Sequence, residues 1–401
     1  MKKTALILAA LMFSSSAAFA SQKIITFDRA YKGSIDKSIE QIGGKVTRHF
    51  RVIDAVAAEF PDDTKNASIY SLKGVNTVEE DSYIRWIESA PATLYTMPLP
   101  TVESAISMIG EGALPEVPAV GAFRADPAAE QKEIPWGVKR LNAPAAWDYN
   151  QGQGVKVAVI DTGMDFTHPD LKGNYKGGYN AVTPGTDPMD DQGHGTHVSG
   201  TIGAVRNAVG VAGVAPKASL YAVKVLDKNG SGQYSWIIDG IEWAITNNMD
   251  VVNMSLGGGQ GNEALKQVMQ KAGEAGVTVV CAAGNDSGPV NYPAKYPQAI
   301  AVSASDNTDK IASFSSRGAE IAVIAPGVNI YSTRKSGGYT TMSGTSMACP
   351  HVAGLAALAV GAGAKSPDQV RKALTGAASK LPNLKPTDQG AGLVDAFKLV
   401  R

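Results

Sequence analysis

Short apolar runs alternate with amphipathic helical patterns over most of this chain, and this alternation limits its possible folds more than any other feature. The helical patterns lie at Ser235–Thr246 and Asn262–Glu274. The apolar runs, rich in Val, Ile, Leu and Ala, are Val155–Ile160, Leu220–Leu226, Val251–Leu256, Val277–Ala283 and Ile300–Ser303. A strand that is apolar on both faces has to be covered on both faces, as in a parallel sheet between two layers of helices. The sequence therefore predicts an α/β fold with a mostly parallel central sheet.

A smaller unit precedes this part of the chain. Its expected strands and helices follow one another in a β-α-β-β-α-β order, which is typical of a ferredoxin-like α+β domain. The predicted elements are Lys23–Phe27, Ser34–Ile42, Val46–Val52, Asp54–Phe60, Asn66–Leu72 and Val75–Val78. An acidic cluster, Glu79–Asp81, and an extended aromatic tail, Tyr83–Trp86, end the unit.

Two further segments have the composition of processing and linking sequences. Residues 1–20 read as a secretory signal, with Lys2 and Lys3, the apolar run Ala5–Phe13 and the small-residue site Ala18–Ala20. Residues 89–133 are rich in Pro and Ala and predict a linker. We therefore divide the chain into a signal at 1–20, a small domain at 21–88, this linker and a large domain at 134–401, and we expect the protein to be secreted.

The charge and the cysteines narrow the choice of partners. Lys plus Arg and Asp plus Glu both number 37, so net charge favours neither nucleic acid nor an anionic membrane, and we expect neither as a partner. Cys281 and Cys349 are too few for a disulfide framework. We expect them to be free buried thiols, with a single bridge as the alternative.

Polar residues gather where predicted strands end and helices begin. Asp161 directly follows one apolar run and Asn285 follows another, while His194 and His197 open a helix. Ser346 lies in a Gly-rich loop that leads into a helix of small residues, where backbone N–H groups favour developing negative charge. Taken singly, each has an ordinary explanation as a turn former or helix cap.

Taken together, these residues fit one mechanism. A carboxylate orients an imidazole, the imidazole takes the serine proton, and Asn285 with the Ser346 backbone N–H binds the oxyanion. The residues themselves do not decide between His194 and His197 as the base. A zinc site lacks an evident third ligand, and an α/β-hydrolase lacks its nucleophile-elbow pattern around Ser346. An inactive scaffold on the same fold is the remaining alternative.

Residues from about 134 to 401 closely resemble the subtilisin family of serine proteases. The resemblance is carried by motifs in the order Asp, His, Ser. They are Val159–Gly163, His194–Val198, Ser255–Gly258, Ala283–Asn285 and Gly344–Ala348. The resemblance implies a three-layer subtilisin-like fold and a monomeric serine endopeptidase acting on polypeptides through an acyl-enzyme. It makes His194 the general base and His197 a structural residue.

By the same resemblance, residues 21–88 form a propeptide that is an intramolecular chaperone and inhibitor, and the enzyme is made as a self-processing zymogen. The propeptide is expected on the helix-covered face of the large domain, where Glu79, Glu80 and Asp81 would cap helix N-termini. The tail from Ser82 to about Glu88 would enter the cleft and be cut.

The resemblance also implies substrate and metal sites. Ser255, Leu256 and Gly257 would pair with substrate backbone, and Leu226, Tyr234, Ile237 and Leu256 would line an apolar pocket. Gly284 and Asn291 would line the primary specificity pocket, which Asn291 makes narrower or more polar. A structural Ca²⁺ would be held by oxygens of Asp170, Val205, Asn207, Val209 and Val211. The family's further glutamine ligand falls at Lys132, one place from Gln131.

Overall fold

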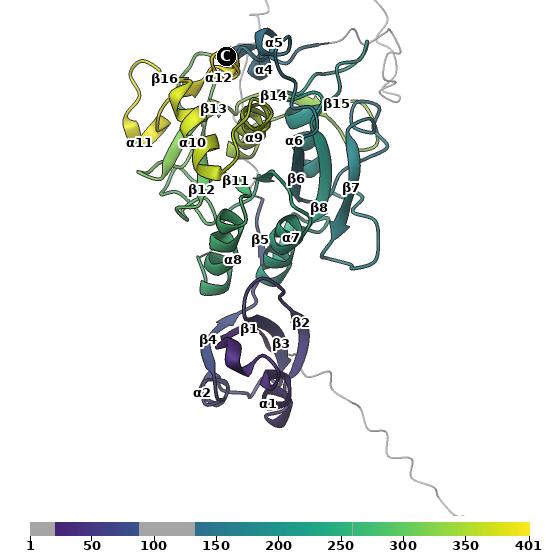
Figure 1. The fold of residues 1–401 in the computed structure, drawn as a ribbon, viewed down its shortest axis with the longest axis vertical. Coiled ribbons are helices and arrows are strands. Elements are labelled where there is room, and N and C mark those ends of the chain that lie inside the picture. The colour runs from purple at the N-terminus through teal and green to yellow at the C-terminus, as the bar shows by residue number, and fades with distance from the viewer. Residues whose placement is uncertain (1–20, 88–132, 259) are drawn as a thin grey trace, which may run out of the picture.

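A computed structural model describes residues 21–87, 133–258 and 260–401 as two bodies joined end to end (Figure 1). We call residues 21–87 the N-terminal unit and residues 133–401 the C-terminal unit. The predicted signal, almost all of the predicted linker, and Gln131 and Lys132 lie outside the described residues.

The N-terminal unit has the predicted β-α-β-β-α-β order. Its elements are β1 (Ser21–Phe27), η1 (Arg29–Tyr31), α1 (Ile35–Gln41), β2 (Lys45–His49), β3 (Ala55–Phe60), α2 (Asn66–Tyr70) and β4 (Val75–Glu80). The sheet order β2-β3-β1-β4 places β1 between two antiparallel partners. The unit has a core of its own, in which side chains such as Ile25, Ile39 and Phe60 are buried.

The C-terminal unit alternates strands and helices as predicted, and the short strand β5 (Tyr83–Arg85) connects it to the N-terminal unit. Its strands are β6 (Lys156–Asp161), β7 (Tyr175–Asn180), β8 (Ser219–Lys224), β9 (Ser231–Gln233), β10 (Val251–Met254), β11 (Thr278–Ala282), β12 (Ala299–Ser305), β13 (Ile321–Pro326), β14 (Ile330–Thr333), β15 (Tyr339–Met342), β16 (Ala378–Ser379) and β17 (Leu393–Val394). Its helices are α4 (Trp136–Arg140), α5 (Ala143–Ala146), α6 (His194–Gly203), α7 (Tyr234–Thr246), α8 (Glu263–Glu274), α9 (Thr345–Gly361), α10 (Pro367–Gly376), α11 (Pro386–Gln389) and α12 (Ala396–Leu399).

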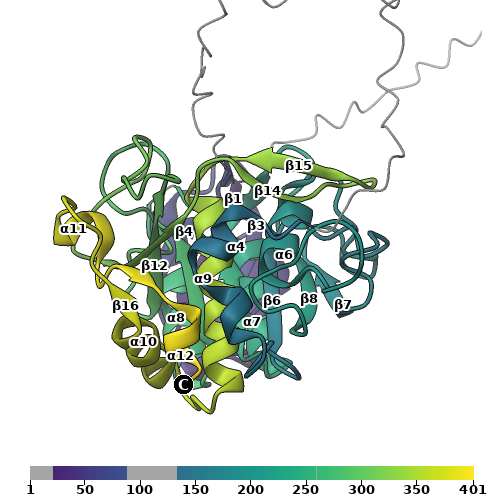
Figure 2. The same ribbon diagram turned by 90° about the horizontal axis from the view of Figure 1, so that it is seen from above.

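Nine of the described strands form one sheet in the order β16-β17-β13-β12-β11-β10-β6-β8-β7, and all neighbours except β16 and β17 are parallel. Along β6, Val157 and Val159 pack into the core beneath α6 and α9, whereas Ala158 and Ile160 pack into the core beneath α7 and α8. Helices therefore cover both faces, and the predicted three-layer α/β fold is confirmed (Figures 1 and 2).

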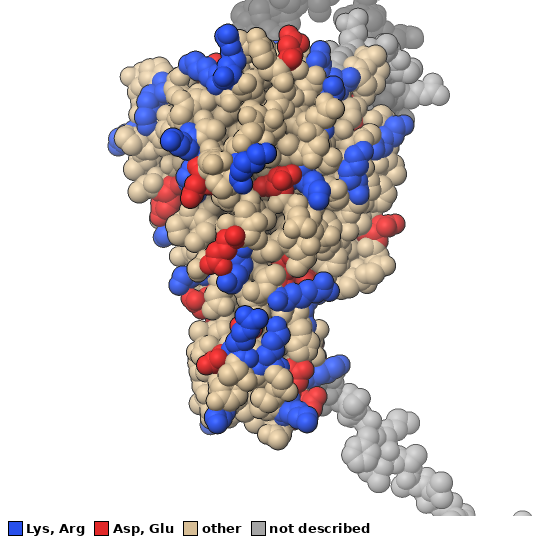
Figure 3. All heavy atoms as spheres, in the orientation of Figure 1, with Lys and Arg blue, Asp and Glu red and all other residues tan. Residues whose placement is uncertain are grey.

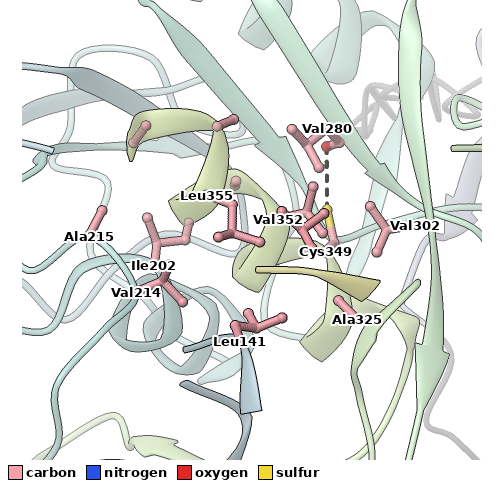
Figure 4. Close-up of a cluster of buried hydrophobic side chains, with 14 of the residues drawn as sticks. Leu141, Ile202, Val214, Ala215, Val280, Val302, Ala325, Cys349, Val352 and Leu355 are labelled. Atoms are coloured by element: carbon pink, nitrogen blue, oxygen red, sulfur yellow. Dashed lines mark hydrogen bonds between the residues drawn. The ribbon is translucent and has the colours of Figure 1, made fainter. Parts of the chain in front are cut away.

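Helix α9 lies in the middle of one helical layer, and its small side chains let it pack closely (Figure 2). A Cβ added to Gly354 would lie 2.6 Å from Val214, so this position requires glycine. Cys349 lies in the same core beside Val352, and its thiol donates to the carbonyl oxygen of Val280 at 3.4 Å (Figure 4). Both cysteines are free and buried, as expected, and burial raises the pKa of each thiol.

Edge elements were not anticipated from the sequence. Strand β7 contains Gly177 and Gly178, and the strands β14 and β15 are short and mix polar with apolar residues, so neither β7 nor the hairpin has a continuous apolar run. On the face drawn in Figure 3, positive and negative side chains are interspersed. Among the described helices, none combines the length and apolar character that a bilayer crossing requires.

Candidate active site

A buried carboxylate and an imidazole meet at the carboxyl end of β6. Asp161 is the last residue of β6 and is fully buried, and His194 is the first residue of α6. The Nδ1–H of His194 donates to the two carboxylate oxygens at 2.8 and 3.0 Å. This close approach depends on Gly195, because an added Cβ would lie 2.1 Å from the carbonyl oxygen of Gly163. The contact fixes the tautomer in which Nε2 is the free acceptor.

The surroundings of three buried histidines differ in a way that distinguishes His194. Burial lowers the pKa of His197 to about 3 and that of His351 to about 4, so both rings are neutral. Burial also acts to lower the pKa of His194, but the charge and hydrogen bond of Asp161 outweigh it and raise that pKa above its ordinary value. His197 and His351 contact main-chain carbonyl oxygens, whereas His194 contacts a carboxylate, whose charge stabilises the imidazolium that a general base must form.

Ser346 lies in the first turn of α9 and is almost completely buried. Its Oγ–H donates to the carbonyl oxygen of Ser255 at 3.0 Å, and Nε2 of His194 has no hydrogen-bond partner among the described residues. Of the two contacts that the predicted mechanism requires, the one between Asp161 and His194 is therefore formed. The hydroxyl of Ser346 bonds to the main chain of Ser255 instead of to His194.

Asn285 follows β11 and is held by the residue before Ser346. Its Oδ1 accepts from the backbone N–H of Thr345 at 2.8 Å and from the Thr345 hydroxyl at 2.9 Å. Because the carbonyl end of the amide is used in this way, its NH₂ end is oriented as a donor. The same hydroxyl accepts from Gly284 N–H at 3.2 Å, which ties the loop after β11 to the start of α9.

Beside these groups lies a small hollow that contains both residues predicted to line the primary specificity pocket. Gly284 and Asn291 both line it, and the amide nitrogen of Asn291 lies 2.5 Å from where a Cβ on Gly284 would be. The remaining lining residues are Trp86, Leu256, Gly257, Ala282, Asn285, Thr345 and Ser346.

The tail of the N-terminal unit runs into this hollow as an added strand. In β5, Ile84 lies opposite Gly232 of β9 in an antiparallel pair. Beyond β5, Trp86 N–H donates to the carbonyl oxygen of Gly230 at 3.0 Å, and Gly257 N–H donates to the carbonyl oxygen of Trp86 at 3.0 Å. The tail is thus held from both sides by main-chain hydrogen bonds, the mode by which extended peptides bind to strand edges.

The side chain of Trp86 anchors the tail. It is 1% exposed and shares one buried cluster with the four predicted pocket residues Leu226, Tyr234, Ile237 and Leu256. Its ring meets that of Tyr234 edge-on at a centroid distance of 4.9 Å, and its Nε1–H donates to the carbonyl oxygen of Gly232 at 2.9 Å.

The N-terminal unit packs against α7 and α8 (Figure 1), and two of three predicted caps are present. Glu79 accepts from the backbone of Glu263 at the start of α8, and Asp81 accepts from Ser235 N–H in the first turn of α7 at 2.8 Å. The prediction for Glu80 is wrong. Side chains alternate along a strand, so Glu80 points away from the helices and pairs with Lys23.

Two further contacts between the N-terminal unit and helix α7 could not be predicted from the sequence. The Glu242 carboxylate on α7 accepts from the backbone N–H groups of Arg51 and Val52 at 2.7–2.9 Å. Arg48 pairs with Asp239, which also accepts from the Tyr179 hydroxyl at 2.6 Å. Burial and this carboxylate raise the pKa of Tyr179 to about 12, so the tyrosine remains a donor. Hydrophobic periodicity identifies these helices but not the partners of their polar face.

The predicted calcium residues gather in one loop around Asp170. Its carboxylate is fully buried and accepts from the Asn207 amide at 2.6 Å, Val211 N–H at 2.9 Å and the Tyr339 hydroxyl at 2.9 Å. Its carbonyl oxygen accepts from Val205 N–H at 2.9 Å. A buried carboxylate whose hydrogen-bond donors are neutral keeps its full negative charge, which suits a hard cation.

Comparisons with known proteins agree with this fold and geometry. The sequence model of the subtilase family matches residues 152–393. Subtilisin E of Bacillus subtilis (strain 168) is 50% identical over 298 residues, which cover 70% of this chain and 77% of that protein. A subtilisin of Bacillus pumilus is 56% identical over 57% of this chain and 84% of its own length. Subtilisin Savinase of Lederbergia lenta is 47% identical over 67% of this chain and all of its own length.

The chain belongs to the subtilase family. It is a serine endopeptidase, and polypeptides are its substrates.

Proposed function

We propose that this chain is the precursor of a secreted endopeptidase that hydrolyses peptide bonds through an acyl-enzyme on Ser346 and cuts its own N-terminal unit free. The observation that carries the proposal is the buried hydrogen bond from His194 to Asp161, which leaves Nε2 unbonded. The insertion of the tail beside Ser346 supports the self-cleavage.

In the proposed reaction, the Ser346 hydroxyl turns from the Ser255 carbonyl to Nε2 of His194 and gives up its proton as its oxygen attacks the substrate carbonyl. Asp161 stabilises the imidazolium that forms. The amide of Asn285 and the backbone N–H of Ser346 bind the oxyanion. The imidazolium then protonates the leaving amine, and water hydrolyses the acyl-enzyme by the same steps.

Covalent labelling tests the nucleophile. A fluorophosphonate should label Ser346 in the processed enzyme, and Ser346→Ala should neither be labelled nor cleave casein. Full casein cleavage by Ser346→Ala would overturn the assignment.

A second variant tests the oxyanion site. Loss of one such donor, for which a subtilisin is the standard measured case, costs about 2.7–4 kcal/mol of transition-state stabilisation. Asn285→Ala should therefore reduce kcat by about 10²–10³-fold with little change in KM. An unchanged kcat would exclude Asn285 from this role.

The N-terminal unit is proposed to be a propeptide that inhibits the enzyme. Its tail fills the cleft as a product would, and its caps and core contacts hold it on α7 and α8. The Ser346→Ala precursor should remain intact when purified alone, whereas wild type should be cut near Glu88. Normal processing of the isolated variant would mean that another protease makes the cut.

Secretion and calcium binding complete the proposal. The basic start, apolar run and small-residue site of residues 1–20 support their removal as a signal, and Ser21, which follows the predicted cleavage site, pairs with Phe60 in the sheet of the N-terminal unit. Asp170, Asn207 and the carbonyls of Val205, Val209 and Val211 would hold Ca²⁺. The ion would cross-link the loop and would take no part in the chemistry.

The primary specificity pocket is proposed to prefer small or polar side chains, because Asn291 narrows it next to Gly284. A peptide library should show faster cleavage after such residues in wild type than in Asn291→Gly. If Asn291→Gly keeps the wild-type preference, this residue does not set it.

A further inference from the structure

A second buried carboxylate lies beside the Asp161–His194 pair, on the loop that precedes α6. Asp190 is 3% exposed and accepts three hydrogen bonds at Oδ1 and two at Oδ2. The donors at Oδ1 are the Thr162 hydroxyl at 2.9 Å and the backbone N–H groups of Gln192 and Gly193 at 2.9 and 2.8 Å. The donors at Oδ2 are the backbone N–H and the hydroxyl of Thr196, at 2.9 and 2.6 Å.

These donors come from the two segments that carry the pair. Thr162 directly follows Asp161, and its hydroxyl also accepts from Gly195 N–H at 2.9 Å. Gln192, Gly193 and Thr196 enclose His194 in the chain, and the Gln192 side chain accepts from His194 N–H at 2.7 Å. One carboxylate therefore joins the end of β6 to the first turn of α6.

The chemistry of this site requires an ionised carboxylate. All five contacts are donated to Asp190, and a carboxylate is the side chain that only accepts. An amide in its place would turn an NH₂ group toward N–H or O–H donors, and the buried groups that lose their acceptor would be left unsatisfied.

We propose that Asp190 is a positioning residue that holds Asp161 and His194 in the geometry needed for proton transfer. The inference rests on the proposed role of that pair. A misplacement of about 1 Å at a reacting group can cost about 10²-fold in rate. Fixing both segments to one rigid acceptor prevents such a shift.

The charge of Asp190 acts in the same direction as its geometry. Within the described part of the chain, the charged or titratable groups that act on the imidazole are Asp161 at the end of β6, Asp190 on the loop and His197 in α6. Lys224 of β8 donates to the Thr162 carbonyl and to Asp191. Although burial lowers the pKa of His194, the negative charges of Asp161 and Asp190 both raise it. Removing the charge of Asp190 should therefore lower that pKa.

Paired substitutions in the enzyme purified from the full-length chain test the proposal. Thr162→Val removes the hydroxyl that links β6 to Asp190 at nearly constant volume, and Thr162→Ser keeps it. With active sites counted by fluorophosphonate labelling, we expect Thr162→Val to lose about 10–100-fold in kcat. Thr162→Ser should stay within about threefold of wild type. Equal kcat in the two variants would overturn the link.

Charge removal gives a readout that a purely structural role would not change. In Asp190→Asn the acidic limb of the kcat/KM profile should move to lower pH, because the pKa of His194 falls. Asp191→Asn is the matched control, since this half-exposed neighbour loses the same charge but accepts no hydrogen bond from α6. The limb should move further in Asp190→Asn than in Asp191→Asn. An acidic limb at the same pH in both variants would refute the claim that the charge of Asp190 raises the pKa of His194.

The two proposals fail separately. If Ser346→Ala is inactive while Thr162→Val and Asp190→Asn match wild type in kcat and pH profile, only the role of Asp190 is wrong. If Ser346→Ala is fully active, the mechanism itself is wrong.

Discussion

The most demanding test of the proposal that the N-terminal unit inhibits the enzyme is the replacement of Trp86 by alanine. The side chain packs with Tyr234 and Leu256 in a cluster that joins the two units, and it lies outside the separate core of the N-terminal unit. Trp86→Ala should therefore weaken the docking of the tail without changing the stability of the unit that carries it.

The magnitude follows from the burial. An aromatic side chain buries about 150–250 Å², which at about 25 cal/mol per Å² is an upper value of about 4–6 kcal/mol. Large-to-small truncation of a buried Trp costs about 3–5 kcal/mol in practice. The Nε1–H bond to Gly232 is included in that range. We expect inhibition to weaken by about 10²–10⁴-fold.

The assay is inhibition of the processed enzyme by a separate peptide of residues 21–87. Any cost of folding the free peptide is the same for both versions, so the ratio of inhibition constants isolates the anchor. Tyr83→Ala is the control on the same tail, because Tyr83 is 51% exposed. It should change inhibition by less than about tenfold. An effect of Trp86→Ala below fivefold would refute the reasoning.

Three further predictions concern charge and metal. The pKa of His194 is raised above 6.5, so the imidazole becomes protonated, and kcat/KM falls, at a pH above that value as the solution is acidified. A loss of kcat/KM only below pH 6 would contradict the Asp161 contact. Arg48→Ala breaks a partly buried ion pair with Asp239 and should weaken inhibition by the separate peptide about tenfold. Lys32→Ala is the control, because it removes an exposed charge and should leave inhibition unchanged. A chelator should lower Tm by several degrees in wild type and not in Asp170→Asn, because a ligand that binds the native state stabilises it; an equal drop in both variants would place the metal elsewhere.

Much of the fold could be predicted because its strands are buried on both faces. Runs such as Val155–Ile160 leave no polar face, and the residues that follow them collect at one edge of the sheet by geometry alone. Strand β7 escaped prediction because an edge strand with Gly177 and Gly178 lacks such a run.

The details of the site were less predictable because they depend on side-chain direction. The sequence predicted that Glu79, Glu80 and Asp81 would all accept hydrogen bonds from helix N-termini. Side chains alternate along a strand, so Glu80 points away from the helices and pairs with Lys23. The hydroxyl of Ser346 points to Ser255 in this state, and no pattern along the chain specifies that rotamer. Asp190 had a usable signal, since an acidic residue shortly before a glycine and a helix start is a common acceptor for the first turn.

The strand β5 has a kinetic consequence. While residues 83–87 are covalently continuous with their own enzyme, their occupancy of the cleft is a unimolecular equilibrium that protein concentration does not affect. Once the chain is cut, rebinding becomes bimolecular, and simple dilution into a large volume favours the free protease. If the proposed cut and secretion take place, dilution into the medium would itself activate the protease without a separate signal.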